Sequence, residues 1–350
     1  MTIPKTMKAL IMTAPGVPMS IGEVPTPSPA KGEVLVKIEA CGVCHTDELY
    51  WRVGPPTTTF PHILGHEGAG TVAVLGEGVT NWNVGDRVSV PMHHGQCGEC
   101  SFCLEGFVTQ CAQKKWHAGE VWGCFAEYAV TSAETIVKLA DNVSFEKAGP
   151  CGCAGVTVTG AIRRANVPKG GWIGFSGAGG LGLMGVQVAK ALGYKTLAID
   201  IDDGKLAEAK KLGADVVVNA ATAPADKGGL PGAVIAQTDG KGLHALLVVT
   251  TAASAFESSW MLVRGGGTVV FIGVTMAEVK YMPVVILSKE IKIMGSLLGS
   301  TDDAKTVLDL VATGKVHPLT SGCKLSEVPH VFEELEKGLV TGRKVVTQFV

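Results

Sequence analysis

The sequence predicts an α/β protein that combines a doubly wound parallel sheet with a second, mainly β and barrel-like domain. Residues 155–295 alternate short apolar strands with amphipathic helices, which is typical of a parallel sheet between layers of helices. Residues 1–154 contain short alternating strands separated by turns, which is typical of a barrel. The 46 glycines among 350 residues are about twice the usual share, which fits the many tight turns of nucleotide-binding folds.

The N-terminal half begins with two predicted strands. Residues 7–14 and 33–40 alternate in hydrophobicity as half-buried strands do. Residues 25–29, with the sequence PTPSP, cannot form regular structure because proline lacks the backbone N–H. Residues 70–74 and 86–90 predict two more short strands.

A loop with four cysteines follows. They are Cys97, Cys100, Cys103 and Cys111. Thiolates at this spacing can converge on one tetrahedral zinc, and because all four positions would be filled, this zinc is predicted to be structural. The alternatives are an iron–sulfur cluster, a disulfide pair and a nucleic-acid zinc module. The spacing differs from that of ferredoxins, a reducing compartment disfavours disulfides, and the loop carries only Lys114 and Lys115 as basic residues.

A glycine-rich turn joins a strand to a helix in the second half. The apolar strand 172–175 runs directly into the turn, and residues 183–192 have helical periodicity. The turn consists of Gly177, Ala178, Gly179, Gly180, Leu181 and Gly182. Glycines at such a turn let a pyrophosphate approach the backbone at the helix N-terminus, so the pattern predicts a dinucleotide site.

Asp200 ends the next predicted strand, 195–199, and lies 23 residues after Gly177. This is close to the spacing expected for the acid that binds the adenosine ribose. A carboxylate there accepts hydrogen bonds from the 2′-hydroxyl and repels a 2′-phosphate, so Asp200 favours NAD over NADP. The alternative for Asp200 is a helix cap or a solvated turn, for which Asp202 and Asp203 are the nearby candidates.

The alternation of strands and helices continues to residue 294. Predicted helices span 206–212 and 255–263, and predicted strands span 215–218, 245–249, 268–273 and 291–294. Residues 221–229 read as an exposed turn. The tail has two amphipathic helices, 302–312 and 326–337, before a strand at 344–349, and we expect it to pack on the N-terminal half.

Cys44, His66 and Cys153 are candidate ligands of a second metal. Thiolate and imidazole are the ligands that zinc prefers, and three protein ligands leave one coordination position open, as a catalytic zinc requires. The alternative is that the cysteines are inert buried thiols and that His66 is a core histidine.

Charge and hydropathy exclude several function classes. The formal net charge of −2 argues against nucleic acid or an anionic membrane as the main partner. We find neither a secretion signal nor a run of apolar residues long enough to span a membrane, so we expect a cytoplasmic protein.

Together, these motifs resemble the zinc-dependent alcohol dehydrogenases of the medium-chain dehydrogenase/reductase superfamily, especially the tetrameric yeast type. The resemblance rests on residues 42–47 (GVCHTD), 65–70 (GHEGAG), 153–157 (CAGVT) and 342–343 (GR), together with the cysteine loop and the glycine turn. It implies a GroES-like catalytic domain at 1–154, an NAD-binding Rossmann domain at 155–295 and a return to the catalytic domain at 296–350. It also implies a homotetramer, with a dimer as the alternative.

The resemblance implies roles for individual residues. Cys44, His66 and Cys153 would hold the catalytic zinc, Glu67 would be an alternating ligand, and Asp47 would orient His66. Thr46 would relay the hydroxyl proton of the substrate. The residues implied to bind NAD, besides the glycine turn (Gly177, Gly179, Gly180, Leu181 and Gly182), are His45, Thr157, Asp200, Lys205, Ile272, Val274 and Arg343. For Arg343, a solvated charge in the tail is the alternative.

The sequence departs from the family pattern at two places. Many family members have a histidine that ends the proton relay five residues after the first zinc cysteine, where this chain has Leu49. Around His93 and His94 the family often has a bulky aromatic wall. A histidine there could admit a larger or more polar substrate or act as the missing base, or it could be a surface-loop residue. Cys151 is interpreted as a bystander of Cys153.

The predicted function is reversible hydride transfer between an alcohol, expected to be primary, and NAD, with two zinc ions per subunit. A polyol or sorbitol-type dehydrogenase is disfavoured because its third ligand would not be a cysteine at position 153. A cinnamyl-type NADP enzyme is disfavoured by Asp200. A non-catalytic sensor that binds zinc and nucleotide is the alternative from another class. The predicted partner is a small alcohol or aldehyde; the sequence names neither the physiological substrate nor the direction.

Overall fold

The computed structural model describes residues 3–55 and 59–349, and the chain divides into two compact units. The first unit comprises Met1–Cys153, Ser300–Ala312 and Pro318–Val350. The second comprises Ala154–Gly299 and Thr313–His317. The second unit is therefore inserted into the first, and the chain passes between them at Cys153 and Ala154.

The first unit is built mainly of antiparallel strands. Its largest sheet consists of β3 (Glu33–Gly42), β5 (Glu67–Leu75), β6 (Arg87–Val90), β9 (Tyr128–Ser132), β10 (Val137–Lys138), β17 (Thr320–Lys324) and β18 (Arg343–Gln348). Smaller sheets are formed by β1 (Thr6–Met12), β2 (Ser20–Pro25) and β4 (His62–Ile63), and by β7 (His93–Gly95) and β8 (Lys115–Trp116). The four strands predicted in this half are confirmed as parts of β1, β3, β5 and β6.

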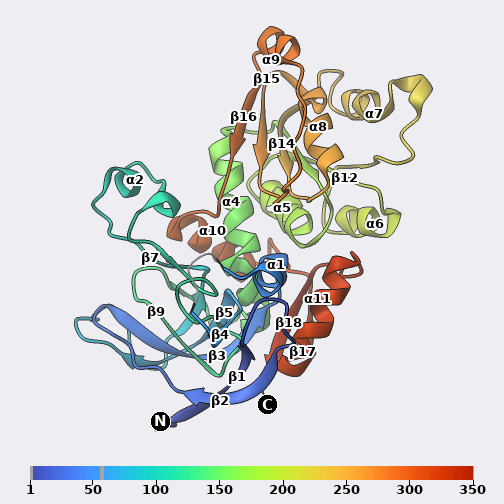
Figure 1. The fold of residues 1–350 in the computed structure, drawn as a ribbon. Helices are drawn as coiled ribbons and strands as arrows, with labels where there is room; N and C mark the ends of the chain where they lie inside the picture. The colour runs from blue at the N-terminus through green and yellow to red at the C-terminus, as the bar shows by residue number, and fades with distance from the viewer. Residues whose placement is uncertain (1–2, 56–58, 350) are drawn as a thin grey trace. The chain divides into compact units, whose positions relative to one another are not determined.

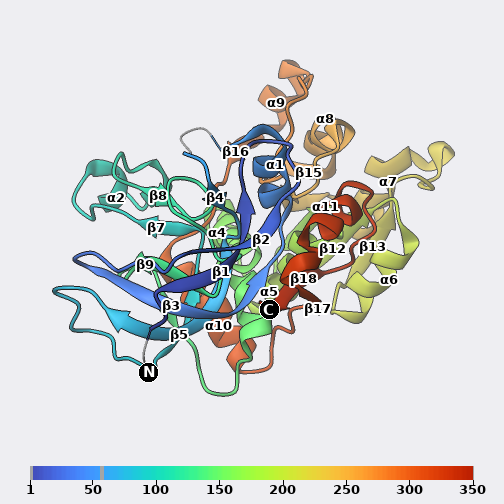
Figure 2. The same ribbon diagram turned by 60° about the horizontal axis from the view of Figure 1, so that its bottom comes forward.

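The C-terminal segment belongs to this unit. β18 pairs with β3, and Val345 lies opposite Gly42. Figure 2 shows the red C-terminal elements, β17, β18 and α11, gathered together. The helices of this unit are α1 (His45–Val53), α2 (Ser101–Leu104), α3 (Phe145–Ala148), α10 (Thr301–Ala312) and α11 (Val328–Glu336), with 3-10 turns η1 (Val108–Gln110), η2 (Gly149–Gly152) and η4 (Leu325–Glu327).

Helix α1, which begins within the GVCHTD motif at His45, is not predicted from the sequence. The Asp47 carboxylate accepts a hydrogen bond from the backbone N–H of Cys44 (3.2 Å), which satisfies a donor at the helix start. Acidic residues occupy its first turn and Arg52 its last, as the helix dipole favours. Nine residues are too few for helical periodicity to stand out in the sequence.

The second unit contains a six-stranded parallel sheet. Its strands are β11 (Trp172–Ser176), β12 (Lys195–Asp200), β13 (Val216–Asn219), β14 (Leu243–Val248), β15 (Val263–Phe271) and β16 (Lys292–Gly295). Their order is β13-β12-β11-β14-β15-β16, so the order reverses beside β11, as in dinucleotide-binding folds. Figure 1 shows helices flanking this sheet, and the predicted fold class is confirmed.

Helices connect these strands. They are α4 (Ala154–Ala165), α5 (Gly180–Ala191), α6 (Asp203–Lys211), α7 (Gly229–Gln237), α8 (Ala253–Leu262) and α9 (Pro283–Lys289), with the 3-10 turn η3 (Ala225–Lys227). Helices α4, α7 and α9 are not predicted from the sequence. Glycine and proline within α7 weaken its helical signal, and α4 is buried along most of its length, which removes the polar face that marks an amphipathic helix.

Each unit has its own hydrophobic core. Phe125 and Phe332 are fully buried in the first unit, and Phe175 of β11 is fully buried in the second. Among the residues that the structure describes, no helix is long and apolar enough to cross a membrane.

Candidate functional site

Four side chains that can bind a metal converge inside the first unit. They are Cys44, His66, Glu67 and Cys153, and their ligand atoms all lie within 4.8 Å of one another. Cys44 immediately precedes α1, and Cys153 follows η2. Glu67 begins β5 and His66 directly precedes it, so three separate segments contribute to one buried cluster.

Asp47 fixes the orientation of the His66 ring. Its Oδ1 accepts hydrogen bonds from His66 Nδ1 (2.8 Å) and from the backbone N–H of Gly65 (2.9 Å). Because Nδ1 donates to a carboxylate, the lone pair of the neutral ring lies on Nε2. His66 and Asp47 are both fully buried, so this pair is shielded from water.

We predict that Asp47→Asn weakens the zinc affinity of this cluster by about 10- to 100-fold, as the loss of a carboxylate partner of a ligating histidine typically does. The amide keeps the shape of the side chain but loses the negative charge that makes the imidazole a better donor. Competition with a chromophoric chelator measures the change. Glu48→Gln is the matched control, because the neighbouring Glu48 carboxylate pairs with Arg52 instead. Equal zinc affinities in the two variants would contradict this role.

The two cysteines of the cluster differ in acidity. The pKa of Cys44 is held well below its usual range because the Cys153 thiol donates a hydrogen bond to it, and the charges of Arg343 and His66 act in the same direction. The same hydrogen bond and burial raise the pKa of Cys153. Thiolate is the metal-binding form of cysteine, so the cluster favours it at Cys44 even before a metal contributes its own charge.

Glu67 is packed against Gly42 and Arg343. A Cβ atom at residue 42 would lie 1.9 Å from Glu67 Oε2, so only glycine leaves room for this carboxylate. Burial raises the pKa of Glu67 to about 8, although the Arg343 guanidinium, 3.3 Å away, opposes the shift. The role of Gly42 was missed in the sequence analysis, and its position beside the first cysteine motif was the available signal.

Arg343 is buried rather than exposed. It is only 5% exposed, and Nη1 donates to the backbone carbonyl of Val43 (3.2 Å) while Nη2 faces Glu67. The alternative that Arg343 is a solvated charge in the tail is therefore wrong. The guanidinium lies beside Glu67 inside the protein, where its charge favours the ionised carboxylate against the effect of burial, and a contact with the pyrophosphate stays a prediction.

Zinc fits this set of donors. His66 Nε2 and both carboxylate oxygens of Glu67 are buried without a hydrogen-bond partner in the described part of the chain. Such groups are costly to bury unless a ligand satisfies them. Two sulfurs and one imidazole nitrogen are preferred zinc ligands, and three of them leave a fourth position for another oxygen.

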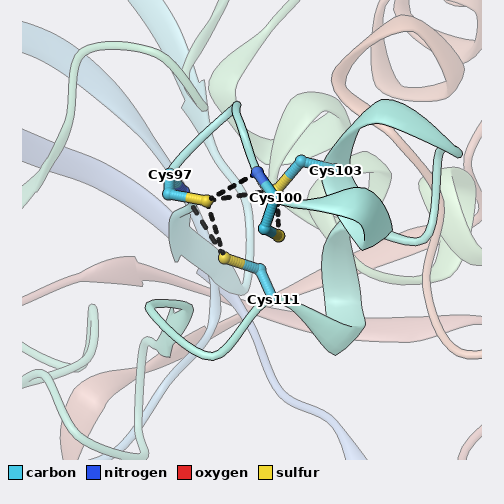
Figure 3. Close-up of side chains that lie close together, drawn as sticks. All are labelled: Cys97, Cys100, Cys103 and Cys111. Atoms are coloured by element: carbon cyan, nitrogen blue, oxygen red, sulfur yellow. Dashed lines mark hydrogen bonds between the residues drawn. The ribbon is translucent and has the colours of Figure 1, made fainter.

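The cysteine loop gathers its four thiols in one place (Figure 3). The sulfur–sulfur distances are 3.5 Å for Cys111–Cys97, 3.5 Å for Cys100–Cys103 and 3.8 Å for Cys97–Cys103. Zinc–sulfur bonds of about 2.3 Å in a tetrahedron place sulfurs about 3.8 Å apart, so the loop has nearly the geometry of a zinc site. Backbone N–H donation from Cys97 lowers the pKa of Cys111 to about 6, which favours its thiolate. All four cysteines are free of disulfides.

We predict that Cys100→Ser removes one equivalent of zinc and destabilises the folded loop by about 4 kcal/mol or more, because a structural zinc supplies folding free energy. Zinc analysis and the rate of proteolysis within residues 97–111 measure the two effects. Cys323→Ser is the control, since Cys323 is a free, partly buried cysteine of the same unit outside both clusters. Unchanged zinc content in Cys100→Ser would exclude Cys100 as a ligand.

The candidate NAD-binding residues of the second unit lie largely at one edge of its sheet. The glycine turn follows β11, Asp200 ends β12, and Ile272 and Val274 follow β15. Because the strands are parallel, these positions share the edge formed by the carboxyl ends of the strands, where dinucleotides bind in this fold. Gly177 has φ +109°, which requires glycine, and a Cβ atom at Gly182 would lie 1.9 Å from the Gly177 carbonyl oxygen.

Asp200 does not cap α6. Its Oδ2 accepts from the backbone N–H of Ala178 (2.6 Å), and Oδ1 accepts from that of Ile201 (2.8 Å). Asp202 is the cap instead, because its side chain accepts from the backbone N–H of Lys205 (2.9 Å). The Asp200 carboxylate is thus held beside the glycine turn.

The other predicted site residues are divided between the two units. Thr157 is buried in α4 of the second unit. In the first unit, His45 is exposed at the start of α1, and its Nε2 lies 3.3 Å from the carbonyl oxygen of Leu335. Thr46 and Leu49 are partly buried in the same helix, three residues apart, and therefore share a face.

His93 and His94 are not surface-loop residues, so that alternative is wrong. They are 7% and 5% exposed. His94 Nε2 lies 3.1 Å from Glu33 Oε1, and its ring contacts that of His117 edge-on at 5.1 Å. Burial lowers the pKa of His94 to about 4. His93 stacks near Trp116, and whether it contacts substrate stays a prediction.

Comparisons with known proteins agree with this geometry. Residues 30–141 match the family model of the alcohol dehydrogenase GroES-like domain, and residues 180–313 match that of the zinc-binding dehydrogenases. An alcohol dehydrogenase of Geobacillus stearothermophilus is 39% identical over 342 residues, which cover 97% of this chain and 99% of the relative.

Solved structures extend this similarity to the fold. An acetophenone reductase of Geotrichum candidum in complex with NAD is 28% identical, with a TM-score of 0.85 and 99% of each chain covered. A cobalt- and zinc-bound thermostable alcohol dehydrogenase of Pyrobaculum aerophilum is 27% identical, with a TM-score of 0.86, and the match covers 97% of this chain and 99% of that one.

Proposed function

This chain belongs to the zinc-dependent alcohol dehydrogenases of the medium-chain dehydrogenase/reductase superfamily, and from this premise we propose that it interconverts primary alcohols and aldehydes, with zinc and NAD as its cofactors. The observation that carries the proposal is the buried convergence of Cys44, His66 and Cys153 around an unpartnered imidazole nitrogen. Full-length similarity to alcohol dehydrogenases supports the reaction, and the choice of primary alcohols rests on the sequence resemblance.

We assign the first unit as the catalytic domain and the second as the NAD-binding domain. Cys44, His66 and Cys153 would hold the catalytic zinc, and the cysteine loop would hold the structural one. Bound at these residues, zinc supplies a Lewis acid that lowers the pKa of a substrate hydroxyl, and NAD supplies the hydride acceptor. His45 and Arg343 are proposed to meet the pyrophosphate.

Residues of the chain itself would then transfer the proton and stabilise the charges at the site. Thr46 follows Cys44 by two residues and would accept the hydroxyl proton and pass it on, because its own hydroxyl does not titrate near neutral pH. Asp47 keeps His66 Nδ1 protonated and its Nε2 available. Glu67 would exchange as a ligand when water leaves, and Arg343 limits the cost of its buried charge.

Leu49 cannot carry a proton, so we propose that the proton leaves through a ribose hydroxyl or another group. We predict that Leu49→His raises turnover at low pH in a manner sensitive to solvent isotope, because an imidazole on the face of Thr46 can extend the relay. The pH–rate profile in H₂O and D₂O measures it, with Leu49→Gln as a polar control that cannot titrate. A profile identical to the wild type would show that the relay does not end at this position.

The activity is tested by initial rates of NAD reduction over a panel from ethanol to benzyl alcohol and simple secondary alcohols, repeated with NADP. We expect rapid turnover with NAD and the highest kcat/KM for primary alcohols. No turnover on any alcohol, with zinc content verified, would overturn the proposal and favour a non-catalytic homologue. Preference for secondary alcohols would overturn only the substrate class.

Assembly and location stay predictions. The yeast-type resemblance predicts a homotetramer, which light scattering coupled to gel filtration measures directly. The expected cytoplasmic location can be tested by fractionation of the source cells.

A further inference from the structure

A cavity lies in the NAD-binding unit, away from the glycine turn. It has a volume of about 230 Å³. Its walls come from the end of α4 and from the amino-terminal parts of β14, β15 and β16. The glycine turn and Asp200 lie at the carboxyl ends of strands in the same parallel sheet, so the cavity is at the opposite edge from the predicted dinucleotide site.

The lining of this cavity is strongly basic. Three cationic side chains and a histidine line it, and no aspartate or glutamate is among the described residues that do so. These four are Arg164, His244, Arg264 and Lys292. Such a concentration of positive charge in a small concave space attracts anions, whereas a cavity that only separates core elements is normally apolar.

Hydrogen bonding at His244 points to a missing acceptor. The backbone N–H of Trp172 donates to His244 Nδ1 (3.0 Å), so Nδ1 carries the lone pair. The proton of the neutral ring must then lie on Nε2. Arg264 Nη1 lies 3.0 Å from this Nε2, and a guanidinium nitrogen can only donate. Two N–H donors therefore face each other at hydrogen-bond distance, and an anionic oxygen that accepts from both would resolve the conflict.

A local irregularity of the sheet creates this arrangement. β14 and β15 pair at Leu243 with Val263 and then at Ala245 with Thr268, so the register shifts between these pairs. The segment 264–267 bulges out opposite His244 and brings Arg264 to it. Lys292 begins the neighbouring strand and pairs with Thr268, which adds its ammonium group to the same edge.

The surrounding charges do not supply that acceptor. Asp239 is the acid that acts on His244, but its carboxylate accepts from Trp172 Nε1 (2.9 Å) and lies 3.5 Å from Lys195 Nζ. Arg164 donates to Ser296 Oγ and to the carbonyl of Leu298, which fixes its guanidinium in the wall. Among the described residues that line the cavity, none is a carboxylate that could act as this acceptor.

We propose that this cavity binds a phosphoryl group, either as inorganic phosphate or on a small metabolite, at a site separate from that of NAD. Arg264 Nη1 and His244 Nε2 would donate to one phosphoryl oxygen, and Lys292 would balance the second negative charge. A dianionic phosphoryl group matches several cations and directed N–H donors better than a monocarboxylate does.

The test titrates inorganic phosphate into the zinc-loaded enzyme saturated with NADH, at low ionic strength, by isothermal calorimetry. Saturating NADH keeps phosphate out of the dinucleotide site. We expect one phosphate per chain with a Kd of about 1 mM or tighter. Arg264→Gln should raise this Kd by at least about 10-fold and Lys292→Gln by about 3- to 10-fold, since each removes a charge-assisted contact. Lys280→Gln, a substitution of an exposed lysine outside the cavity, should leave it unchanged.

Two further measurements test the source of the phosphoryl group and the role of His244. Glycerol 3-phosphate carries the same group on a small organic body, and tighter binding than phosphate would identify a metabolite as the source. Imidazole ¹⁵N shifts of His244 should show Nε2–H in the free enzyme and a change at Nε2 on phosphate addition, a readout that needs no variant. Absence of phosphate binding, equal binding of acetate, or unchanged binding in Lys292→Gln would each overturn the proposal.

Discussion

Replacing Cys153 by serine is expected to remove the catalytic zinc and to lower kcat/KM by about 1,000-fold or more. A Lewis acid at the reacting oxygen stabilises the transition state by several kcal/mol, and about 4 kcal/mol corresponds to this factor. Serine keeps the approximate size of the side chain but is a poor zinc ligand at neutral pH, because its hydroxyl stays protonated. Zinc analysis, together with initial rates of NAD reduction, measures the loss.

Cys151→Ser is the matched control for this prediction. Cys151 lies two residues away, is also buried, and has its pKa raised to about 12 by burial. Its thiol donates to the carbonyl oxygen of Lys147 (3.3 Å), outside the metal cluster. We expect zinc content and turnover near the wild type. Loss of metal from Cys151→Ser, with metal retained in Cys153→Ser, would show that the assignment of the two cysteines is reversed.

The features that could be predicted from sequence are those encoded within a short stretch. The cysteine loop needs only the spacing of Cys97 to Cys111, and the dinucleotide fold needs only a strand, a glycine turn and a helix in succession. In both cases the residues that form the sequence pattern are the same residues that form the structural feature. The observed parallel sheet and the convergence of the four sulfurs agree with these local patterns.

The features that sequence reasoning missed depend on contacts between distant segments. Arg343 is buried because β18 pairs with β3, which brings the tail beside Glu67. His94 is buried because Glu33 and His117, from separate parts of the barrel, close around its ring. The residues next to Arg343 and His94 in the sequence give no sign of these contacts. The sequence therefore suggests the chemistry of each side chain but not its exposure.

The two facing N–H donors at His244 and Arg264 also depend on contacts between distant segments. It requires the backbone N–H of Trp172 on one side of the ring and the bulge that carries Arg264 on the other. The sequence shows only one arginine before three glycines, which reads as an ordinary turn. The two donors meet only when β14 and β15 pair in the folded chain.

Asp200→Asn is expected to lower kcat/KM for NAD by about 10- to 100-fold and to raise kcat/KM for NADP. A charge-assisted hydrogen bond contributes about 1.5–3 kcal/mol, which corresponds to this range, and removal of the carboxylate charge also removes its repulsion of a 2′-phosphate. Both oxygens of Asp200 accept from backbone N–H groups, of Ala178 on one side and Ile201 on the other, so an asparagine amide keeps one of these contacts and loses the other along with the charge. Initial rates with each cofactor at a fixed alcohol concentration measure the ratio.

Asp203→Asn separates this specific role from a general loss of negative charge at the edge of the sheet. Asp203 lies three residues further on, and its Oδ1 accepts from Asn219 Nδ2 (2.7 Å) rather than facing the glycine turn. We expect its NAD-to-NADP ratio to match the wild type. If both variants shift the ratio equally, cofactor choice arises from the long-range field of several acids. If only Asp200→Asn shifts it, one carboxylate beside the glycine turn selects NAD.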